Sequence, residues 1–443
     1  MQHSDGVSQK EMMENNQSAA QEISALEAEA ARAMQSGREQ DALGCWGRIL
    51  ALEPNHGATL TAMGQYAFRK GDVDSARTAF QRVVDTDGSD PQQWISLALV
   101  YQRMKDEEGE ARAIASALTA DPSDLLALIL RGNLLERQGK KQQAAQAYGA
   151  AATVSPPLER LAPSLQPAVA HAVEYREQYD YDCGRFLDEY LDPYYKEYKG
   201  ENLKRFGDSV DILIGRKRRY DSQSMLHHYP GLPAIEFFAR SDFPWLDAFE
   251  AATDEIRDEF LNVLRDEEGF TPYITYPDGV PLNQWAELNN SPNWSAFHLY
   301  KMGQVVEKNA ARCPRTMQLL GTAPQPDQPG RTPAAMFSLL KPKTRIPPHV
   351  GVSNVRLVTH LPLIVPESCG FRVGNDTREW VPGKAWVFDD TIEHEAWNDS
   401  DKLRVVLILD IWHPHLTPPE RAMINAMTAG LNAFSGATSA FDL

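Results

Sequence analysis

Small and large apolar side chains recur along the N-terminal part of the chain with a period of 34 residues. In each unit a small residue precedes a large apolar one, and the unit ends at Pro or Gly, which suits two packed antiparallel helices. The small position holds Ala42, Ala76, Glu110 and Ala144, and the large position holds Trp46, Phe80, Ile114 and Tyr148. The turn between the two helices holds Gly37, Gly71, Lys105 and Gly139. The pattern predicts helical hairpins that share one continuous core, because a single hairpin could not bury its apolar face alone.

These positions and their spacing resemble the tetratricopeptide repeat, so we predict a repeat solenoid over residues 21–156. The resemblance implies a concave groove that binds a peptide or protein partner, with a spacer or dimerisation arm as the alternative. The polar residues 1–20 are predicted to be disordered. Residues 157–230 are predicted to form a helical connector whose row of tyrosines packs against the solenoid or forms a binding surface.

After the connector the pattern changes to short alternating strands, which begin near Trp294 and end near Pro414. Along residues 354–364, one face carries Val355, Leu357, Leu361 and Leu363, and the other carries Arg356, Val358, His360 and Ile364. A Pro-Gly turn at residues 382–383 predicts a hairpin between the segments on either side of it. Short antiparallel strands with regular turns favour a jelly-roll barrel of the cupin type over residues 231–420. Residues 421–443 are predicted to form a C-terminal helix or tail.

The net charge of −17 argues against nucleic acid as a partner, since phosphate binding needs clustered Lys and Arg. No run of roughly 18 apolar residues occurs, so no membrane anchor is expected. The first residues lack the basic and apolar regions of a signal peptide. The four cysteines are scattered, which fits a reducing compartment, and we therefore predict a cytoplasmic protein.

Two histidines and an arginine carry the candidate chemistry. His349 follows Pro347-Pro348, His394 lies in a segment rich in acids, and Arg404 follows ten residues later on an apolar strand. Imidazole is a good ligand for Fe(II), and an arginine fork pairs with both oxygens of a carboxylate. The order therefore indicates a non-haem iron site that binds a small dicarboxylate.

Four stretches in this region, at residues 309–316, 338–360, 386–397 and 403–414, resemble the aspartyl/asparaginyl β-hydroxylase family of oxygenases. The resemblance covers roughly residues 230–420, and the order of a repeat domain before a hydroxylase domain resembles the longer members. It implies a double-stranded β-helix, that is, a jelly-roll or cupin-like oxygenase domain after the all-α solenoid. It also implies dependence on Fe(II), 2-oxoglutarate and O2.

Carried over to this sequence, the family pattern places the iron ligands at His349 and His394. It places 2-oxoglutarate at Arg404 and Ser338, which would hold the distal carboxylate, and at His360, which would face the proximal end. No catalytic residue beyond the metal centre is implied, because the cofactor and the metal perform the chemistry.

Most 2-oxoglutarate oxygenases have an acid two residues after the first histidine, and here that position is Gly351. The family that the sequence resembles is known for iron bound by two histidines without a carboxylate, so the glycine fits. The acids near the second histidine remain open as a third ligand or as partners that orient the imidazole; they are Asp389, Asp390, Glu393 and Glu395.

The implied reaction is hydroxylation of an unactivated C–H, with the β-carbon of Asp or Asn in a peptide recruited by the repeats as the leading substrate. In members of the family that act on aspartyl side chains, two arginines would recognise the substrate carboxylate, and here Val358 and Asn289 stand in their places. Arg356, Arg372 and Arg378 are candidate substitutes. The alternatives are a hydroxylase of a lipid or small molecule, and a catalytically silent metal-binding interaction protein. A zinc hydrolase lacks the third protein ligand that zinc sites usually have.

Overall fold

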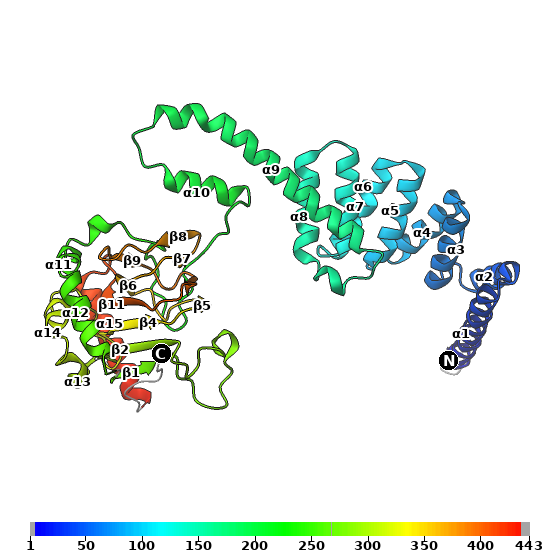
Figure 1. Cartoon of the computed structure of the whole chain (residues 1–443). Coiled ribbons are helices and arrows are strands. Elements are labelled where there is room, and N and C mark those ends of the chain that lie inside the picture. The colour runs from blue at the N-terminus through cyan, green and yellow to red at the C-terminus, as the bar shows by residue number, and fades with distance from the viewer. Residues whose placement is uncertain (1–4, 267, 436–443) are drawn as a thin grey trace. The chain divides into compact units, whose positions relative to one another are not determined.

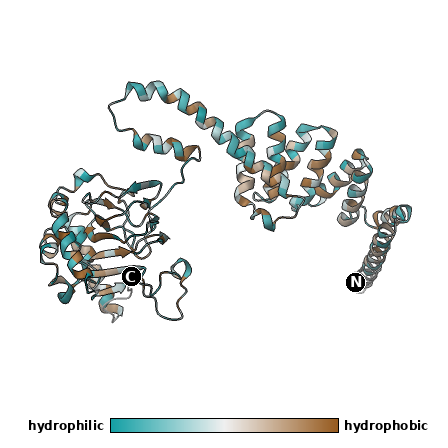
Figure 2. Ribbon diagram, in the orientation of Figure 1, coloured by the Kyte–Doolittle hydropathy of each residue, from teal (hydrophilic) through white to brown (hydrophobic). Residues whose placement is uncertain are grey.

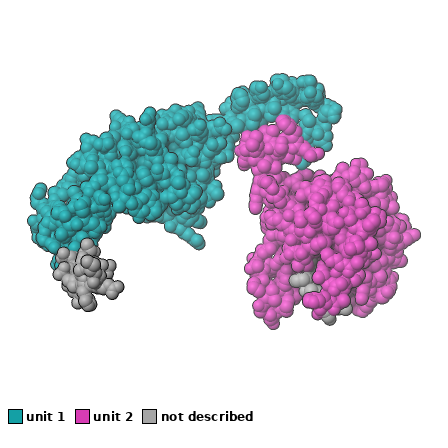
Figure 3. Space-filling view, turned by 180° about the vertical axis from the view of Figure 1, so that it is seen from behind, with its two compact units in different colours: residues 1–204 teal, residues 205–443 magenta. Residues whose placement is uncertain are grey.

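The computed structural model describes residues 5–266 and 268–435. The chain divides into two compact units, residues 1–204 and 205–443 (Figure 3). The division falls inside the predicted connector, residues 157–230, and our finer domain limits stay a prediction. Each unit is described by itself below.

The described part of the first unit is helical (Figure 1). Its elements are α1 (Asp5–Gln35), α2 (Glu39–Leu52), α3 (Gly57–Lys70), α4 (Val73–Thr86), α5 (Pro91–Met104), α6 (Glu107–Ala120), α7 (Leu125–Arg137), α8 (Lys141–Val154), a short 3-10 turn (Leu158–Arg160) and α9 (Gln166–Glu197). The helices from α1 to α8 pack as consecutive pairs, which confirms the predicted hairpins. Lys105 takes the left-handed conformation (φ 59°) that glycine takes at the other three inter-helix turns, so the odd residue of the pattern keeps the same turn.

Close approach of the paired helices explains the small residues of the repeat. A Cβ atom on Gly132 of α7 would clash with the ring of Tyr148 of α8, and one on Gly64 of α3 would lie 2.9 Å from Phe80 of α4. The aromatic rings therefore occupy space that only glycine leaves open.

The structure differs from the prediction of disorder for residues 1–20, because α1 is helical from Asp5 onward. The helix is anchored further along, where Ile23, Leu26, Ala30 and Ala33 are buried against α2. The polar residues before this anchor include Glu, Gln, Lys, Met and Ala, which favour a helix once one has begun. Residues 1–4 lie outside the described part of the chain.

The tyrosine-rich connector is mainly the long helix α9. Near its start, Tyr175 packs on Tyr148 with ring centroids 5.1 Å apart. Further along, Phe186, Tyr190 and Tyr194 are exposed and lie against one another. The expected packing on the solenoid is therefore seen at Tyr175 but not at these three residues.

The second unit contains two antiparallel sheets. Their strands are β1 (Phe270–Pro272), β2 (Trp294–Lys301), β3 (Gln304–Val305), β4 (Ala335–Leu340), β5 (Thr344–His349), β6 (Arg356–Ile364), β7 (Cys369–Val373), β8 (Asp376–Glu379), β9 (Trp386–Phe388), β10 (His394–Asn398) and β11 (Arg404–Trp412). The larger sheet has the order β1-β2-β4-β11-β6-β9, with β3 beside β2, and the smaller one has the order β5-β10-β7-β8. From β4 to β11 the chain passes from one sheet to the other at every step except between β7 and β8, which is the jelly-roll order and confirms the predicted fold.

Helices cover the outer face of the larger sheet (Figure 1). The helices of this unit are α10 (Lys204–Leu213), α11 (Leu246–Ala251), α12 (Thr253–Leu264), α13 (Glu307–Ala310), α14 (Pro314–Leu320) and α15 (Pro418–Ser435), with 3-10 turns at Arg240–Asp242 and Asn283–Trp285. Strands β4 and β11 in the middle of the larger sheet are strongly hydrophobic (Figure 2). On β6, Leu357 and Leu361 join the core under the helices, whereas Arg356 and His360 line the space between the sheets. The predicted alternation of this strand is therefore confirmed.

The predicted hairpin around Pro382-Gly383 is wrong. Gly383 has the expected positive φ of 76°, but β8 pairs with β7 in the smaller sheet and β9 pairs with β6 in the larger one. The chain crosses from one sheet to the other here, and the Gly383 N–H donates to the Pro362 carbonyl (2.9 Å). Strands β8 and β9 follow each other in the sequence but lie in different sheets.

No helix in the described ranges is long and apolar enough to cross a membrane. The cytoplasmic location stays a prediction. The C-terminal helix α15 covers most of the predicted C-terminal segment, and residues 436–443 lie outside the described part.

Candidate active site

A pocket of about 500 Å³ opens between the two sheets. Six of the predicted site residues line it: His349, His394, Arg404, Ser338, His360 and Arg356. They come from β4, β5, β6, β10 and β11, so the fold brings together residues up to 66 positions apart, from Ser338 to Arg404. Asn289 is not among the described residues that line the pocket.

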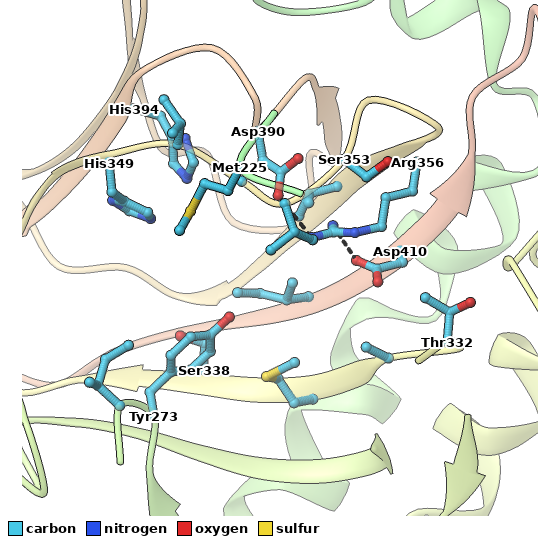
Figure 4. Close-up of a pocket in the computed structure, with 18 of the residues that line it drawn as sticks. Met225, Tyr273, Thr332, Ser338, His349, Ser353, Arg356, Asp390, His394 and Asp410 are labelled. Carbon is cyan, nitrogen blue, oxygen red and sulfur yellow. Dashed lines mark hydrogen bonds and ion pairs between the residues drawn. The ribbon is translucent and has the colours of Figure 1, made fainter. Parts of the chain in front are cut away.

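The two predicted metal ligands lie side by side (Figure 4). His349 and His394 are register partners on β5 and β10, and their ring centroids are 4.0 Å apart. The Nδ1 atom of His349 donates to the Pro347 carbonyl (2.8 Å), and that of His394 donates to the Ile392 carbonyl (3.0 Å). Since a carbonyl can only accept, each Nδ1 carries the proton and each Nε2 keeps a lone pair for a metal.

Burial keeps both imidazoles neutral. Burial, followed by the neighbouring imidazole, lowers the pKa of His349 to about 3. Burial also lowers the pKa of His394 to about 4. The neutral ring is the form that binds a metal.

The four acids near His394 are each held by another group. Asp389 accepts from the backbone and hydroxyl of Thr391 (2.9 and 2.6 Å). Asp390 pairs with Arg356 (3.0 Å), and Glu393 and Glu395 both pair with Arg372. No group of three or more His, Cys, Asp or Glu side chains suited to a metal occurs among the described residues.

The space around Gly351 explains why this position does not hold the acid that is usual in 2-oxoglutarate oxygenases. A Cβ atom on Gly351 would clash with the carboxylate of Asp390, and the Gly351 N–H donates to the Asp390 carbonyl (2.6 Å). A side chain at position 351 therefore has no room, and the carboxylate of Asp390 fills the space instead.

Arg404 forms a second centre in the pocket. Its side chain is 2% exposed, its Nε has no hydrogen-bond partner, and it has no acidic partner within the described part of the chain. Burial lowers its pKa to about 10, so the guanidinium is still charged at neutral pH. The Cζ atom of Arg404 lies 5.5 Å from the centroid of the Trp380 ring. A buried cation without an anion is costly, so this position suits an anionic ligand.

Ser338 and His360 lie at the same end as Arg404. The Ser338 hydroxyl accepts from Trp294 Nε1 (3.2 Å), which leaves its own proton free to donate to a ligand. His360 stacks on Trp380 (5.6 Å), and its buried Nδ1 has no partner. Burial, and then the charge of Arg404, hold the pKa of His360 well below its ordinary value.

The two candidates for the substrate side are already engaged. Arg356 is bound by Asp390 and by Asp410 (2.9 Å). The Asn289 side chain closes a loop, because its oxygen accepts from the Tyr276 N–H (2.7 Å) and its amide donates to the Tyr276 carbonyl (3.3 Å). That Asp410 has a partner could be expected from the sequence, because a carboxylate within an apolar strand must be paired when it is buried. The contributions of Trp294 and Trp380 had no signal in the sequence.

Two family models match the chain, and one of them covers most of the pocket described above. The family model for aspartyl/asparaginyl beta-hydroxylase matches residues 250–414, and the tetratricopeptide-repeat model matches residues 27–93 and 109–159. The chain belongs to the aspartyl/asparaginyl β-hydroxylase family. The predicted family is thereby confirmed, and the matched range contains the six pocket residues named above.

Two curated relatives illustrate the range of the family. Human aspartyl/asparaginyl beta-hydroxylase is 27% identical over 367 residues, which are 81% of this chain but 43% of the human protein. The ornithine lipid ester-linked acyl 2-hydroxylase of Rhizobium tropici is 34% identical over 200 residues, which are 44% of this chain and 67% of that protein. This chain therefore spans less than half the length of its human relative. Among solved structures, the crystal structure of a MamA protein matches with a TM-score of 0.32 and 15% identity, over 40% of this chain and 96% of that chain.

Proposed function

We propose that the chain is an Fe(II)- and 2-oxoglutarate-dependent dioxygenase that hydroxylates an unactivated C–H. The observation that carries the proposal is the buried Arg404, which has no acidic partner among the described residues, in the same pocket as two histidines whose protonated Nδ1 atoms leave Nε2 able to bind a metal. A dicarboxylate that chelates a metal at one end and needs a cation at the other fits both features.

The residues present fit the cofactors. His349 and His394 would hold Fe(II) through nitrogen, and the metal's remaining positions would be left for the cosubstrate, water and O2. Arg404 and the free proton of Ser338 would bind the distal carboxylate of 2-oxoglutarate. His360 lies at the same end of the pocket as Arg404 and would contact the cosubstrate there, rather than at its proximal end. When bound, iron and 2-oxoglutarate supply the oxidising power that inserts one oxygen atom of O2 into a C–H bond.

The chain's own residues position ligands and exclude water. The carbonyls of Pro347 and Ile392 orient the two imidazoles, and Trp294 orients the hydroxyl of Ser338. Trp380 packs against both Arg404 and His360 and keeps that end dry. No protein base is required.

The leading substrate is the β-carbon of Asp or Asn in a peptide or protein. The family gives this reaction, and the repeats supply a surface on which a peptide partner could be recruited. A lipid acyl chain is the second candidate, because the Rhizobium relative is named as an acyl hydroxylase.

Succinate formation from 2-oxoglutarate tests the proposal without knowledge of the substrate. The protein is incubated in air with Fe(II) and 2-oxoglutarate, and slow uncoupled succinate is expected. The variant His349→Ala/His394→Ala should form none. His228→Ala is the matched control, because His228 is exposed and outside the pocket lining, and it should retain the wild-type rate.

The alternative of a silent interaction protein makes the opposite prediction. In that case wild type and double variant would form equally little succinate although iron binds to the wild type. That result would end the oxygenase proposal.

A further inference from the structure

The middle of the pocket, between the histidines and its far end, is occupied by a buried charge cluster. The Nη2 of Arg356 contacts Asp390 at 3.0 Å, and the Nη1 contacts Asp410 at 2.9 Å (Figure 4). The three side chains are 13%, 8% and 9% exposed, respectively. One cation thus faces two carboxyl groups, and the cluster has no net positive charge even with one of the acids protonated.

Among the described residues that line the pocket, a substrate carboxylate would therefore find no free cation beside the histidines. Asn289, the other residue predicted on the substrate side, is used to close its loop. Arg404 lies at the opposite end, where the cosubstrate is proposed to bind. Arg356 is the cation of this region, and both of its donor ends are taken.

Two further cations line the pocket, but at its far end. Lys301 ends β2, seven residues after Trp294, so at about 3.3 Å per residue it lies on the order of 20 Å further along the strand. Trp294 marks the histidine end, with its ring centroid 6.5 Å from that of His349. Arg331 precedes Thr332, which Figure 4 shows far from the histidines.

The same region offers an acceptor. The Oδ1 atom of Asp390 is buried and has no hydrogen-bond partner, while its Oδ2 holds Arg356. Asp390 lies between His394 and Arg356 in the close-up, on the wall of the pocket (Figure 4). A buried carboxylate oxygen without a partner is stabilised by a hydrogen bond from an N–H donor, whereas a second carboxylate beside it would be repelled.

From this charge arrangement we propose that the side chain presented to the iron carries N–H donors and no carboxylate, so that the substrate is an Asn amide rather than an Asp. The inference rests on the proposed function and narrows it. The amide N–H would donate to Asp390 Oδ1, whereas an Asp side chain would meet Asp390 and Asp410 without a free cation to compensate.

Two synthetic peptide pools test the proposal. They are identical, with degenerate flanks, except that the central residue is Asn in one and Asp in the other. Each is incubated with the full chain, Fe(II), 2-oxoglutarate and air, and the mass increase of one oxygen atom is measured together with succinate. We expect at least about tenfold more hydroxylated product from the Asn pool.

The possible outcomes distinguish the preference for Asn from the oxygenase function on which it rests. Equal or greater hydroxylation of the Asp pool overturns the preference for the amide. Succinate without modification of either pool also overturns it, and leaves the oxygenase proposal standing. An absence of succinate in every sample overturns the oxygenase proposal itself.

A variant tests whether the cluster of Arg356, Asp390 and Asp410 causes the preference for Asn. Asp410→Asn removes one carboxylate and leaves Arg356 paired with Asp390 alone, so the net charge of the cluster with both acids ionised changes from −1 to zero. The repulsion of an Asp substrate then weakens, and the ratio of Asn to Asp product should fall at least about tenfold. Asp401→Asn is the control, because Asp401 is an exposed carboxylate outside the pocket lining, and its ratio should equal that of wild type. An unchanged ratio in folded Asp410→Asn would contradict the role of the cluster, and the wild-type comparison stands if that variant does not fold.

Discussion

The helical solenoid and the β-sandwich treat buried polar groups differently. In the solenoid the buried Glu110 carboxylate accepts two hydrogen bonds from Arg137 Nη2, both at 2.7 Å, and one from Gln102 (3.2 Å). In the sandwich the buried Arg404 has no acid and its Nε has no partner. Within the described ranges, every buried side-chain nitrogen or oxygen without a partner lies in the second unit.

This difference separates a unit built for packing from one built around a ligand. An unsatisfied buried group costs about 1–3 kcal/mol, so a chain that avoids them in one unit is expected to keep them in the other for a reason. Four such groups line the pocket: His298, His360, Asp390 and Arg404. Of these four, His360 and Arg404 lie where 2-oxoglutarate is proposed to bind.

The sharpest test of the comparison is Arg404→Met. The variant should lower the affinity for 2-oxoglutarate by at least about a hundredfold, because a buried carboxylate loses its charged partner. The free energy of unfolding of the ligand-free protein should stay level or rise, since an unpaired charge is replaced by an apolar chain. Isothermal titration and denaturant unfolding measure the two quantities, and a large loss of ligand-free stability would contradict the account.

Arg356→Met is the opposite case in the same pocket. It leaves two buried carboxyl groups without their cation, and we expect the free energy of unfolding to fall by about 3 kcal/mol at neutral pH. Burial already raises the pKa of Asp410 to about 6, against the lowering effect of Arg356. Without Arg356 the folded pKa rises further above its unfolded value, so the loss should shrink as the pH falls toward about 4. Denaturant unfolding at several pH values measures this, and a loss that grows on acidification would exclude the explanation.

Gly351→Asp asks whether the usual acid can be restored. Because the Asp390 carboxylate fills that space, the new side chain should destabilise the protein by about 1–3 kcal/mol rather than add a ligand. Thermal unfolding with and without Fe(II) measures both effects. A variant of unchanged stability that binds iron more tightly would show that the space is open.

The smallest effect is expected in the solenoid. Glu110→Ala restores the residue type of the other repeats, and Arg137, which is 40% exposed, can then be solvated. We expect a loss of about 1 kcal/mol, because partial exposure weakens the contribution of the pair. Urea unfolding of the full chain, followed by circular dichroism, measures it. A loss as large as that of Arg356→Met would remove the contrast between the units.

The solenoid and the alternation of β6 could be predicted because their signals are local, whereas the metal-binding role of His349 and His394 came from the family resemblance and stays a prediction. The repeat depends on small and large residues a few positions apart, and the alternation of β6 lies within one strand. The hairpin at Gly383 was mispredicted because strand pairing in a jelly roll is not local. The engagement of Arg356 also escaped prediction, since its partners lie 34 and 54 residues away in the sequence.

The most direct measurement is anaerobic addition of 2-oxoglutarate to the Fe(II)-loaded protein, followed by visible absorption. A keto acid bound through two oxygens to Fe(II) gives a charge-transfer band, so the account predicts this band in wild type and in the exposed control Arg219→Met. It predicts a much weaker band in Arg404→Met at the same 2-oxoglutarate concentration. No band in wild type with iron demonstrably bound would contradict the account.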